Sequence, residues 1–225
     1  MRRALLAEYV GTAGLVFLGC GAIMLSDHLD WFNHLWVSMS WGAAVAAMIY
    51  AFGAVSGAHI NPAVSVAFVV AGKLPKDRLL SYVSVQIAGA LTGAGLLKLM
   101  QPDHPTLGSA LPSLDVWIAA SIELVLTFLL MSVVIYLSTG FKQLGKYAGL
   151  LIGFTVFLEA YFAGPYTGAS MNPARSLGPA VMSGNLDHLA LYLPAILLGA
   201  LLAIPTCRLF RKWDSVDDKD CCVDC

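Results

Sequence analysis

Two Asn-Pro-Ala triplets are the residues of this chain whose types and spacing most clearly indicate a chemical role. Asparagine is a favoured helix N-cap, and proline is tolerated in the first helical turn because its missing N–H would be unpaired there anyway. Each triplet begins a run of about ten apolar residues, too few to cross a bilayer. We therefore predict two re-entrant half-helices that start at Asn61, Pro62 and Ala63 and at Asn172, Pro173 and Ala174.

The N-termini of such half-helices would have an electrostatic effect. Each helix N-terminus carries the equivalent of roughly half a positive charge, so two that meet inside a membrane oppose the passage of cations, including hydronium. Non-helical backbone at that depth is allowed only where it is buried in protein or lines a water-filled cavity. The triplets therefore predict the lining of an aqueous pore.

Three glutamates interrupt otherwise apolar stretches of the chain. Ionisable groups are costly in hydrocarbon and are candidates for function by default. Glu8 and Glu123 each begin the pattern Glu-x-x-x-Thr, whereas Glu159 has no counterpart in the first half. Two roles are open for the first two, support of the pore loops or proton relay, and Glu159 either supports a loop or contacts solute.

Six membrane spans must position these groups. Of the 225 residues 58% are apolar and 12% are charged, whereas about a quarter are charged in soluble proteins. A span needs about 20 apolar residues, and we predict spans at about 4–25, 35–55, 79–99, 116–138, 147–163 and 189–209. The fold class is thus an all-α membrane protein with one channel domain, residues 1–212, and a Cys- and Asp-rich tail, residues 213–225.

The two halves of the chain repeat one another, about residues 1–100 and 115–210. Gly-x-x-x-Gly-Ala-x-x-Asn-Pro-Ala begins at Gly53 and again at Gly164. Three spans in each copy is an odd number, so the second copy enters the membrane from the other side. The repeats are therefore inverted, and the half-helices should meet end to end near the midplane.

Charge placement predicts the orientation, because Lys and Arg are retained in cytoplasmic loops. Basic residues cluster on one side of the predicted membrane: Arg2, Arg3, Lys73, Lys76, Arg78, Lys142, Lys146, Arg208, Arg211, Lys212 and Lys219. We expect an integral protein of the cell membrane with both termini in the cytoplasm. In the tail, Cys221, Cys222 and Cys225 form either a solvated segment or a thiolate site for a soft metal; we favour the former and expect no metal.

The segments SGAHINPAVS and TGASMNPARSLGPA resemble the two signature loops of the aquaporin family, also called major intrinsic proteins. The resemblance covers all but about the last dozen residues. It implies the aquaporin fold, a homotetramer in membrane lipid, and a pore in which the amides of Asn61 and Asn172 donate to passing oxygens. It gives Glu8 and Glu123 the role of holding the loops, and we assign Glu159 to loop support as well. Backbone carbonyls along the pore would come from Gly57, Ala58, His59, Gly168, Ala169 and Ser170.

In this family a narrower constriction is formed by four residues, which correspond here to Trp41, Ala160, Ala169 and Arg175. Strictly water-selective members usually have a histidine at the position of Ala160, so its absence implies a wider aperture. The quartet resembles that of the plant nodulin-like intrinsic proteins, whose substrates include water, glycerol and uncharged metalloid hydroxides such as arsenous or boric acid. Ser176, by contrast, is typical of water channels, where glycerol facilitators carry aspartate.

The function expected from the sequence is a passive channel for water and small neutral solutes that excludes protons and ions. A water-selective channel is the nearest alternative. A secondary transporter is another, because inverted repeats with broken helices also occur in carriers. The five histidines show no metal-ligand spacing and no Ser/His/Asp set is evident, so we expect neither an enzyme nor a cofactor, and no nucleic-acid partner. The small residues Gly89, Gly93 and Gly95 permit close contact between helices.

Overall fold

A computed structural model describes residues 1–139 and 145–210, and its regular structure in these ranges is helical. Six helices of 20 to 25 residues are α1 (Arg2–Ser26), α2 (His34–Ser56), α4 (Leu79–Met100), α5 (Val116–Thr139), α7 (Ala148–Thr167) and α9 (Leu189–Phe210). Each contains a stretch long and apolar enough to cross a membrane. The predicted fold class is confirmed, while Cys221, Cys222, Cys225 and the rest of the tail lie outside the described residues.

Two short helices begin at the triplets, α3 (Pro62–Val70) with 9 residues and α8 (Pro173–Ser183) with 11. The side chain of Asn61 caps α3 by accepting from the N–H of Ala63 at 2.8 Å, and Asn172 caps α8 by accepting from Ala174 at 3.0 Å. Proline follows each cap at the first helical position. The residues that were predicted to start half-helices do so. A short 3-10 turn, η1 (Lys76–Arg78), leads from the first half-helix toward α4.

The fifth span is longer than the sequence predicted, because the helix continues past Pro165 to Thr167. Proline has no N–H, so the carbonyl four residues earlier, that of Tyr161, loses its helical donor. The His34 Nε2 atom lies 2.9 Å from that oxygen and replaces the missing bond. Gly168, at φ 79°, then ends the helix in the left-handed conformation that glycine adopts without strain.

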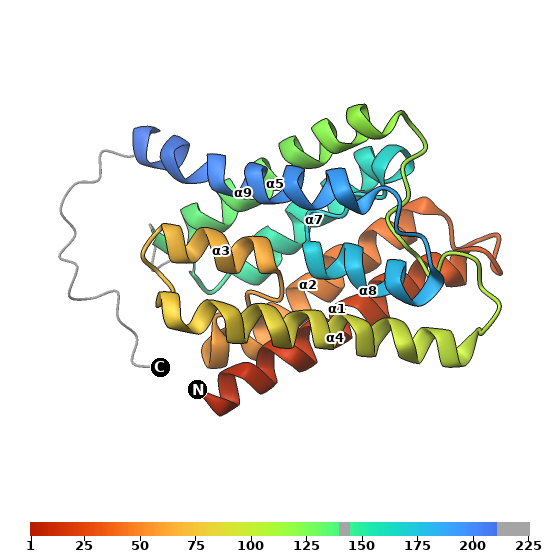
Figure 1. Cartoon of the computed structure of the whole chain (residues 1–225), viewed down its shortest axis with the longest axis horizontal. Coiled ribbons are helices and arrows are strands. Elements are labelled where there is room, and N and C mark those ends of the chain that lie inside the picture. Colours follow the sequence, from red (N-terminus) through yellow and green to blue (C-terminus); the bar gives the residue numbers. More distant parts are fainter. Residues whose placement is uncertain (140–144, 211–225) are drawn as a thin grey trace.

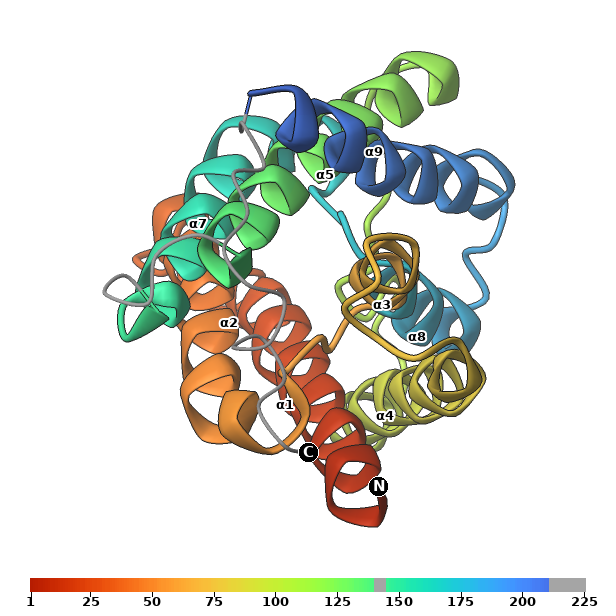
Figure 2. The same cartoon turned by 90° about the vertical axis from the view of Figure 1, so that its left-hand side faces the viewer.

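The two half-helices lie end to end along the long axis of the molecule (Figure 1). An end-on view shows them between α9 and α4, with the other long helices to one side (Figure 2). Within each half the first and last long helices pack together, α1 with α4 and α5 with α9. Across the halves, α2 packs on α7, α3 on α9 and α8 on α4. Each half-helix is therefore held by the last helix of the opposite half as well as of its own.

Glycines allow the long helices to approach one another closely. A Cβ on Gly93 would lie 2.5 Å from the carbonyl oxygen of Ala13, and one on Gly89 would collide with that of Tyr9. Gly89 and Gly93 therefore serve the packing of α4 on α1 within the chain. They carry no information about contacts between subunits.

The N-terminal end of α1 and the C-terminal end of α9 lie at the same end of the molecule, on the left in Figure 1. The basic residues of the predicted cytoplasmic side begin α1 or lie in the connections at this same end, as these described residues show: Arg2, Arg3, Lys73, Lys76, Arg78 and Lys146. The charge asymmetry of the sequence is thus an asymmetry between the two ends of the fold.

Candidate functional site

A cavity of about 590 Å³ lies within the helical assembly. One end is lined by Tyr50 and Lys146, near the basic end of the molecule, and the other by Trp41 and Arg175. The side chain of Asn61, the residue before α3, lines it between these ends, together with Asn172 before α8. Most other lining residues are apolar, so the polar groups of the two loops stand out in this wall.

Glu8 binds the loop before the first half-helix (residues 57–61) through a set of short hydrogen bonds. Its Oε1 accepts from the N–H of His59 at 2.9 Å and its Oε2 from the N–H of Ile60 at 2.7 Å. The hydroxyl of Ser56 donates to Oε1 at 2.6 Å, and Gln86 Nε2 donates to Oε2 at 2.7 Å. A carboxylate is stable at this fully buried position because all four neighbours are donors.

Glu123 repeats this arrangement for the loop before the second half-helix (residues 168–172). Its oxygens accept from the N–H of Ser170 at 2.9 Å, the N–H of Met171 at 2.8 Å and the hydroxyl of Thr167 at 2.7 Å. The place of Gln86 is taken by apolar Ile196 at the same point of the repeat. The second glutamate therefore has one fewer type of donor than the first.

Both loops are held in a conformation that side chains other than glycine rarely adopt. Ala58 and Ile60 have φ values of 46° and 43°, and Ala169 and Met171 have 40° and 53°. Positive φ is a marked outlier for a β-branched residue such as Ile60, and each such residue costs on the order of 1–3 kcal/mol. The bonds from the glutamates hold the N–H groups of these segments and offset that strain.

The two asparagines link the loops directly. Asn61 Nδ2 donates to the carbonyl of Met171, and Asn172 Nδ2 donates to the carbonyl of Ile60, both at 2.9 Å. A side-chain amide carries two N–H groups, so each asparagine makes one bond across to the other half and has one N–H left. Both residues line the cavity. The sequence alone gave no indication of these crossed bonds.

Near the Trp41 end of the cavity, the Arg175 guanidinium lies 4.6 Å from the Trp41 ring centroid, a cation–π arrangement. Arg175 Nη1 donates to the carbonyl of Gly108 at 2.9 Å, while no described residue accepts from its Nε or Nη2. Ala169 also lines the cavity. Ala160 lies outside the lining, buried one helical turn beyond the lining residue Val156.

Glu159 differs from the other two glutamates in its hydrogen bonding. It is 7% exposed, and neither of its carboxylate oxygens has a hydrogen-bond partner among the described residues. Among these residues Glu159 makes no hydrogen bond to a pore loop, and the N–H groups of Ser170 and Met171 are bound to Glu123. A charged carboxylate is unfavourable at such a position.

Further loop contacts come from residues whose roles sequence reasoning did not assign. Tyr82 and Tyr192 donate their hydroxyls to the carbonyls of Ser56 and Thr167, at 3.0 and 2.9 Å. Their matching positions in the repeat were the available signal. His59 packs between the rings of Phe68 and Tyr82 and hydrogen-bonds to Ser65, which orients it in the cavity wall. Gly57 and Ser170 also line the cavity, whereas Gly168, expected to supply a carbonyl, does not. No cluster of metal ligands occurs in residues 1–139 and 145–210.

Comparison with known proteins gives consistent matches. The sequence pattern of the family described as "Major intrinsic protein" matches residues 1–205. The chain is 39% identical over 209 residues to aquaporin NIP1-1 of Zea mays, covering 92% of this chain and 74% of that protein. It is 35% identical over 214 residues to nodulin-26 of Glycine max, covering 93% and 78%. The fold matches an X-ray structure of the aquaglyceroporin from Plasmodium falciparum, with a TM-score of 0.80, 24% identity and 94% and 96% coverage.

Proposed function

The chain belongs to the major intrinsic protein family and is a membrane channel for water and small solutes, and we propose that its pore passes glycerol-sized neutral molecules together with water. The observation that carries this proposal is that the Trp41 end of the cavity combines an apolar surface with hydrogen-bond donors. The flat apolar ring of Trp41 faces the Arg175 guanidinium, whose Nε and Nη2 have no hydrogen-bond partner in the part of the chain that the structure describes. A polyol can rest its carbon chain on the ring while its hydroxyls accept from Arg175.

Small side chains in this part of the molecule support the same solutes. Ala160 and Ala169 are small and apolar and belong to the same buried cluster as Trp41; Ala169 lines the cavity, and Ala160 lies just outside its lining. A histidine at position 160 would fill space and add a polar wall. We propose that the four residues Trp41, Ala160, Ala169 and Arg175 form the selectivity constriction. Glycerol and the uncharged hydroxides of arsenic and boron share the required features, which are small size, neutrality and several hydroxyl groups.

We propose that the half-helices exclude protons and other cations. Pro62 and Pro173 begin helices whose N-termini face one another, and each contributes roughly half a positive charge there. Arg175 adds a full positive charge nearer the Trp41 end. A passing oxygen accepts from the free N–H of Asn61 and of Asn172, and the loop carbonyls supply acceptors along the path. We propose Gly57, Ala58, His59, Ala169 and Ser170 for this role, and Glu8 and Glu123 as the supports that hold them.

The setting of the channel is part of the proposal. The N-terminal end of α1 and the C-terminal end of α9 lie at the basic end of the fold. This end is proposed to face the cytoplasm, because Lys and Arg are retained on that side of the membrane. The protein is proposed to act in a cell membrane as a homotetramer with one pore in each subunit. Residues 213–225 are proposed to form a cytoplasmic tail.

Stopped-flow light scattering on proteoliposomes tests the solute range. Vesicles containing the protein should equilibrate water, glycerol and arsenous acid faster than empty vesicles, at rates proportional to the solute gradient. An ion gradient should not change these rates. Water flux alone would support the water-selective alternative, and saturable, ion-coupled uptake would support a transporter.

A further inference from the structure

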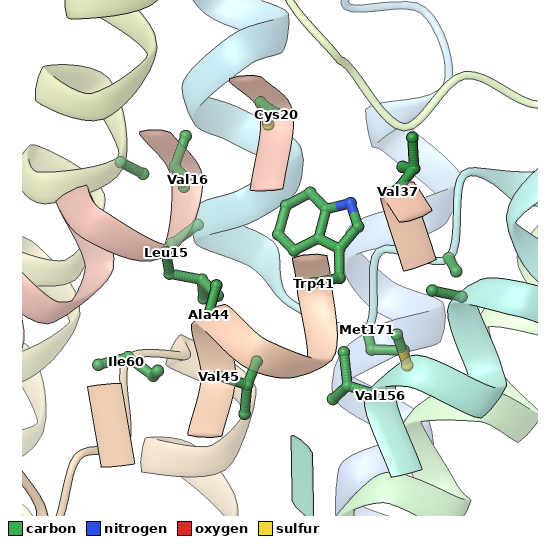
Figure 3. Packing of buried hydrophobic residues seen from close by; sticks show 14 of the residues in the cluster. Leu15, Val16, Cys20, Val37, Trp41, Ala44, Val45, Ile60, Val156 and Met171 are labelled. Atoms are coloured by element: carbon green, nitrogen blue, oxygen red, sulfur yellow. The ribbon is translucent and has the colours of Figure 1, made fainter. Parts of the chain in front are cut away.

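The position of the Trp41 ring depends on a residue of a different helix, Gly19 in α1. A Cβ built on Gly19 would overlap three ring carbons of Trp41, the farthest at 2.5 Å. All three belong to the six-membered part of the indole. Figure 3 shows the indole beside the segment of α1 that carries Cys20, the next residue in the chain. The ring can occupy its present place only because residue 19 has no side chain.

Gly19 differs in this respect from the glycines that bring helices together. Gly93 faces a backbone carbonyl, and Gly42 faces the backbone carbonyl of Gly153 at 2.6 Å, so a larger residue there would push whole helices apart. The three closest atoms to Gly19 belong to one side chain. Of that contact pair, only Trp41 is in the cavity lining, which places the indole between Gly19 and the lumen. Added volume at residue 19 is therefore transmitted to the pore wall.

The next residue of α1 contacts the other polar member of the same region. Cys20 Sγ lies 3.7 Å from Arg175 Nη1, which also donates to the carbonyl of Gly108. Gly108 is itself packed on Cys20, since a Cβ there would lie 2.8 Å from three Cys20 atoms. Cys20 is fully buried and does not line the cavity. Two consecutive residues of α1 thus stand behind Trp41 and Arg175.

We propose that Gly19 is a specificity-determining residue of this channel. Its missing side chain lets the Trp41 indole lie back from the cavity and so sets the width of the aperture, and Cys20 holds the neighbouring Arg175 guanidinium in place by contact. This inference rests on the proposed function for the identity of the solute. The coupling between Gly19 and Trp41 does not, because a narrower aperture also slows water.

The test is a double-mutant cycle between residues 19 and 41, read as glycerol and water permeability in proteoliposomes. Gly19→Ala should press the indole toward the lumen and lower glycerol flux about tenfold, which corresponds to an added barrier of about 1.4 kcal/mol and is within the usual cost of overpacking. Water flux should fall much less, so the ratio of glycerol to water permeability falls. Trp41→Phe removes the ring that carries the overlapped carbons, and in that background Gly19→Ala should have no effect.

Two further variants complete the design. Gly21→Ala is a matched control in the same helix, where the nearest atom to the added carbon is a flexible Leu97 methyl at 3.3 Å, and it should leave the permeability ratio unchanged. Cys20→Ala removes atoms and creates no clash, so it should reach the membrane normally. It frees Arg175 Nη1 from one contact and should raise the ratio about twofold, a change of about 0.4 kcal/mol in barrier.

The outcomes separate the inference from the proposed function. An equal drop caused by Gly19→Ala in both backgrounds would overturn the inference, as would a Gly21→Ala channel with the same altered ratio. If the parent channel passes only water, the proposed function fails. The double-mutant cycle is then measured as water flux. In that case Gly19→Ala should lower water flux in the parent channel and have no effect in the Trp41→Phe channel. If Gly19→Ala fails to fold with Trp41, then recovery of folding and flux in the double variant supports the coupling, and failure of both contradicts it.

Discussion

Replacement of Glu8 by glutamine tests whether the carboxylates hold the pore loops. Four donors converge on this side chain: the N–H groups of His59 and Ile60, the Ser56 hydroxyl and the Gln86 amide. Glutamine offers one oxygen, which can serve two donors, and one NH₂ group, which faces the other two. One or two buried donors therefore lose their acceptor in Glu8→Gln.

The magnitude follows from the cost of an unsatisfied buried donor, about 1–3 kcal/mol each, so that Glu8→Gln should lose roughly 1–6 kcal/mol of folding free energy. For a chain of this size, that loss lowers Tm by roughly 2–20 °C. It is also a large part of a typical total stability of about 5–15 kcal/mol. The strained φ values at Ala58 and Ile60 would then relax and distort the pore loop, so water flux should fall as well.

Thermal unfolding of the detergent-solubilised protein measures the loss, and Glu159→Gln is the matched control. The same atoms are exchanged there, but neither Glu159 oxygen has a hydrogen bond to lose within the described residues. We expect the control to have an unchanged or higher Tm. If Glu8→Gln and Glu159→Gln have the same Tm, the hydrogen bonds to Glu8 do not stabilise the fold and the reasoning is refuted.

Three other variants give distinct expected results. Ala160→His should reduce glycerol flux more than water flux in proteoliposomes, because an imidazole fills the space beside Trp41; an unchanged ratio would place Ala160 away from the constriction. Arg175→Val should admit cations, measured as a current or a proton leak in the same vesicles. If the Arg175→Val channel passes no cations, the half-helices alone account for the exclusion of cations. Tyr82→Phe and Tyr192→Phe should each cost about 1 kcal/mol through one lost hydrogen bond, seen as similar small drops in Tm; a large difference between them would show that the two loops are not equivalent.

The architecture could be predicted from the sequence because it depends on local or repeated signals. Span length, the odd number of spans in each repeat and the capping preference of Asn-Pro are all visible in one dimension. The end of α7 was not, because Pro165 is normally a stop signal and the carbonyl it leaves free is satisfied by His34, more than a hundred residues away.

The candidate site could be predicted in its residue types but not in its connections. Asn61 and Asn172 were identifiable, yet their bonds to Ile60 and Met171 exist only once two inverted segments meet. Glu159 shows the opposite case. Its residue type suggested loop support, but its oxygens have no hydrogen-bond partner among residues 1–139 and 145–210, where the N–H of Ser170 is bound to Glu123.

The glycerol reflection coefficient of proteoliposomes tests the central claim most directly, because it reports whether water and glycerol share one pore. If glycerol passes the constriction of Trp41 and Arg175 along with water, a glycerol gradient exerts little osmotic force across it. We predict a coefficient well below one for vesicles that contain the channel, and a return toward one in Ala160→His. A coefficient equal to that of empty vesicles, with water flux intact, would contradict the account.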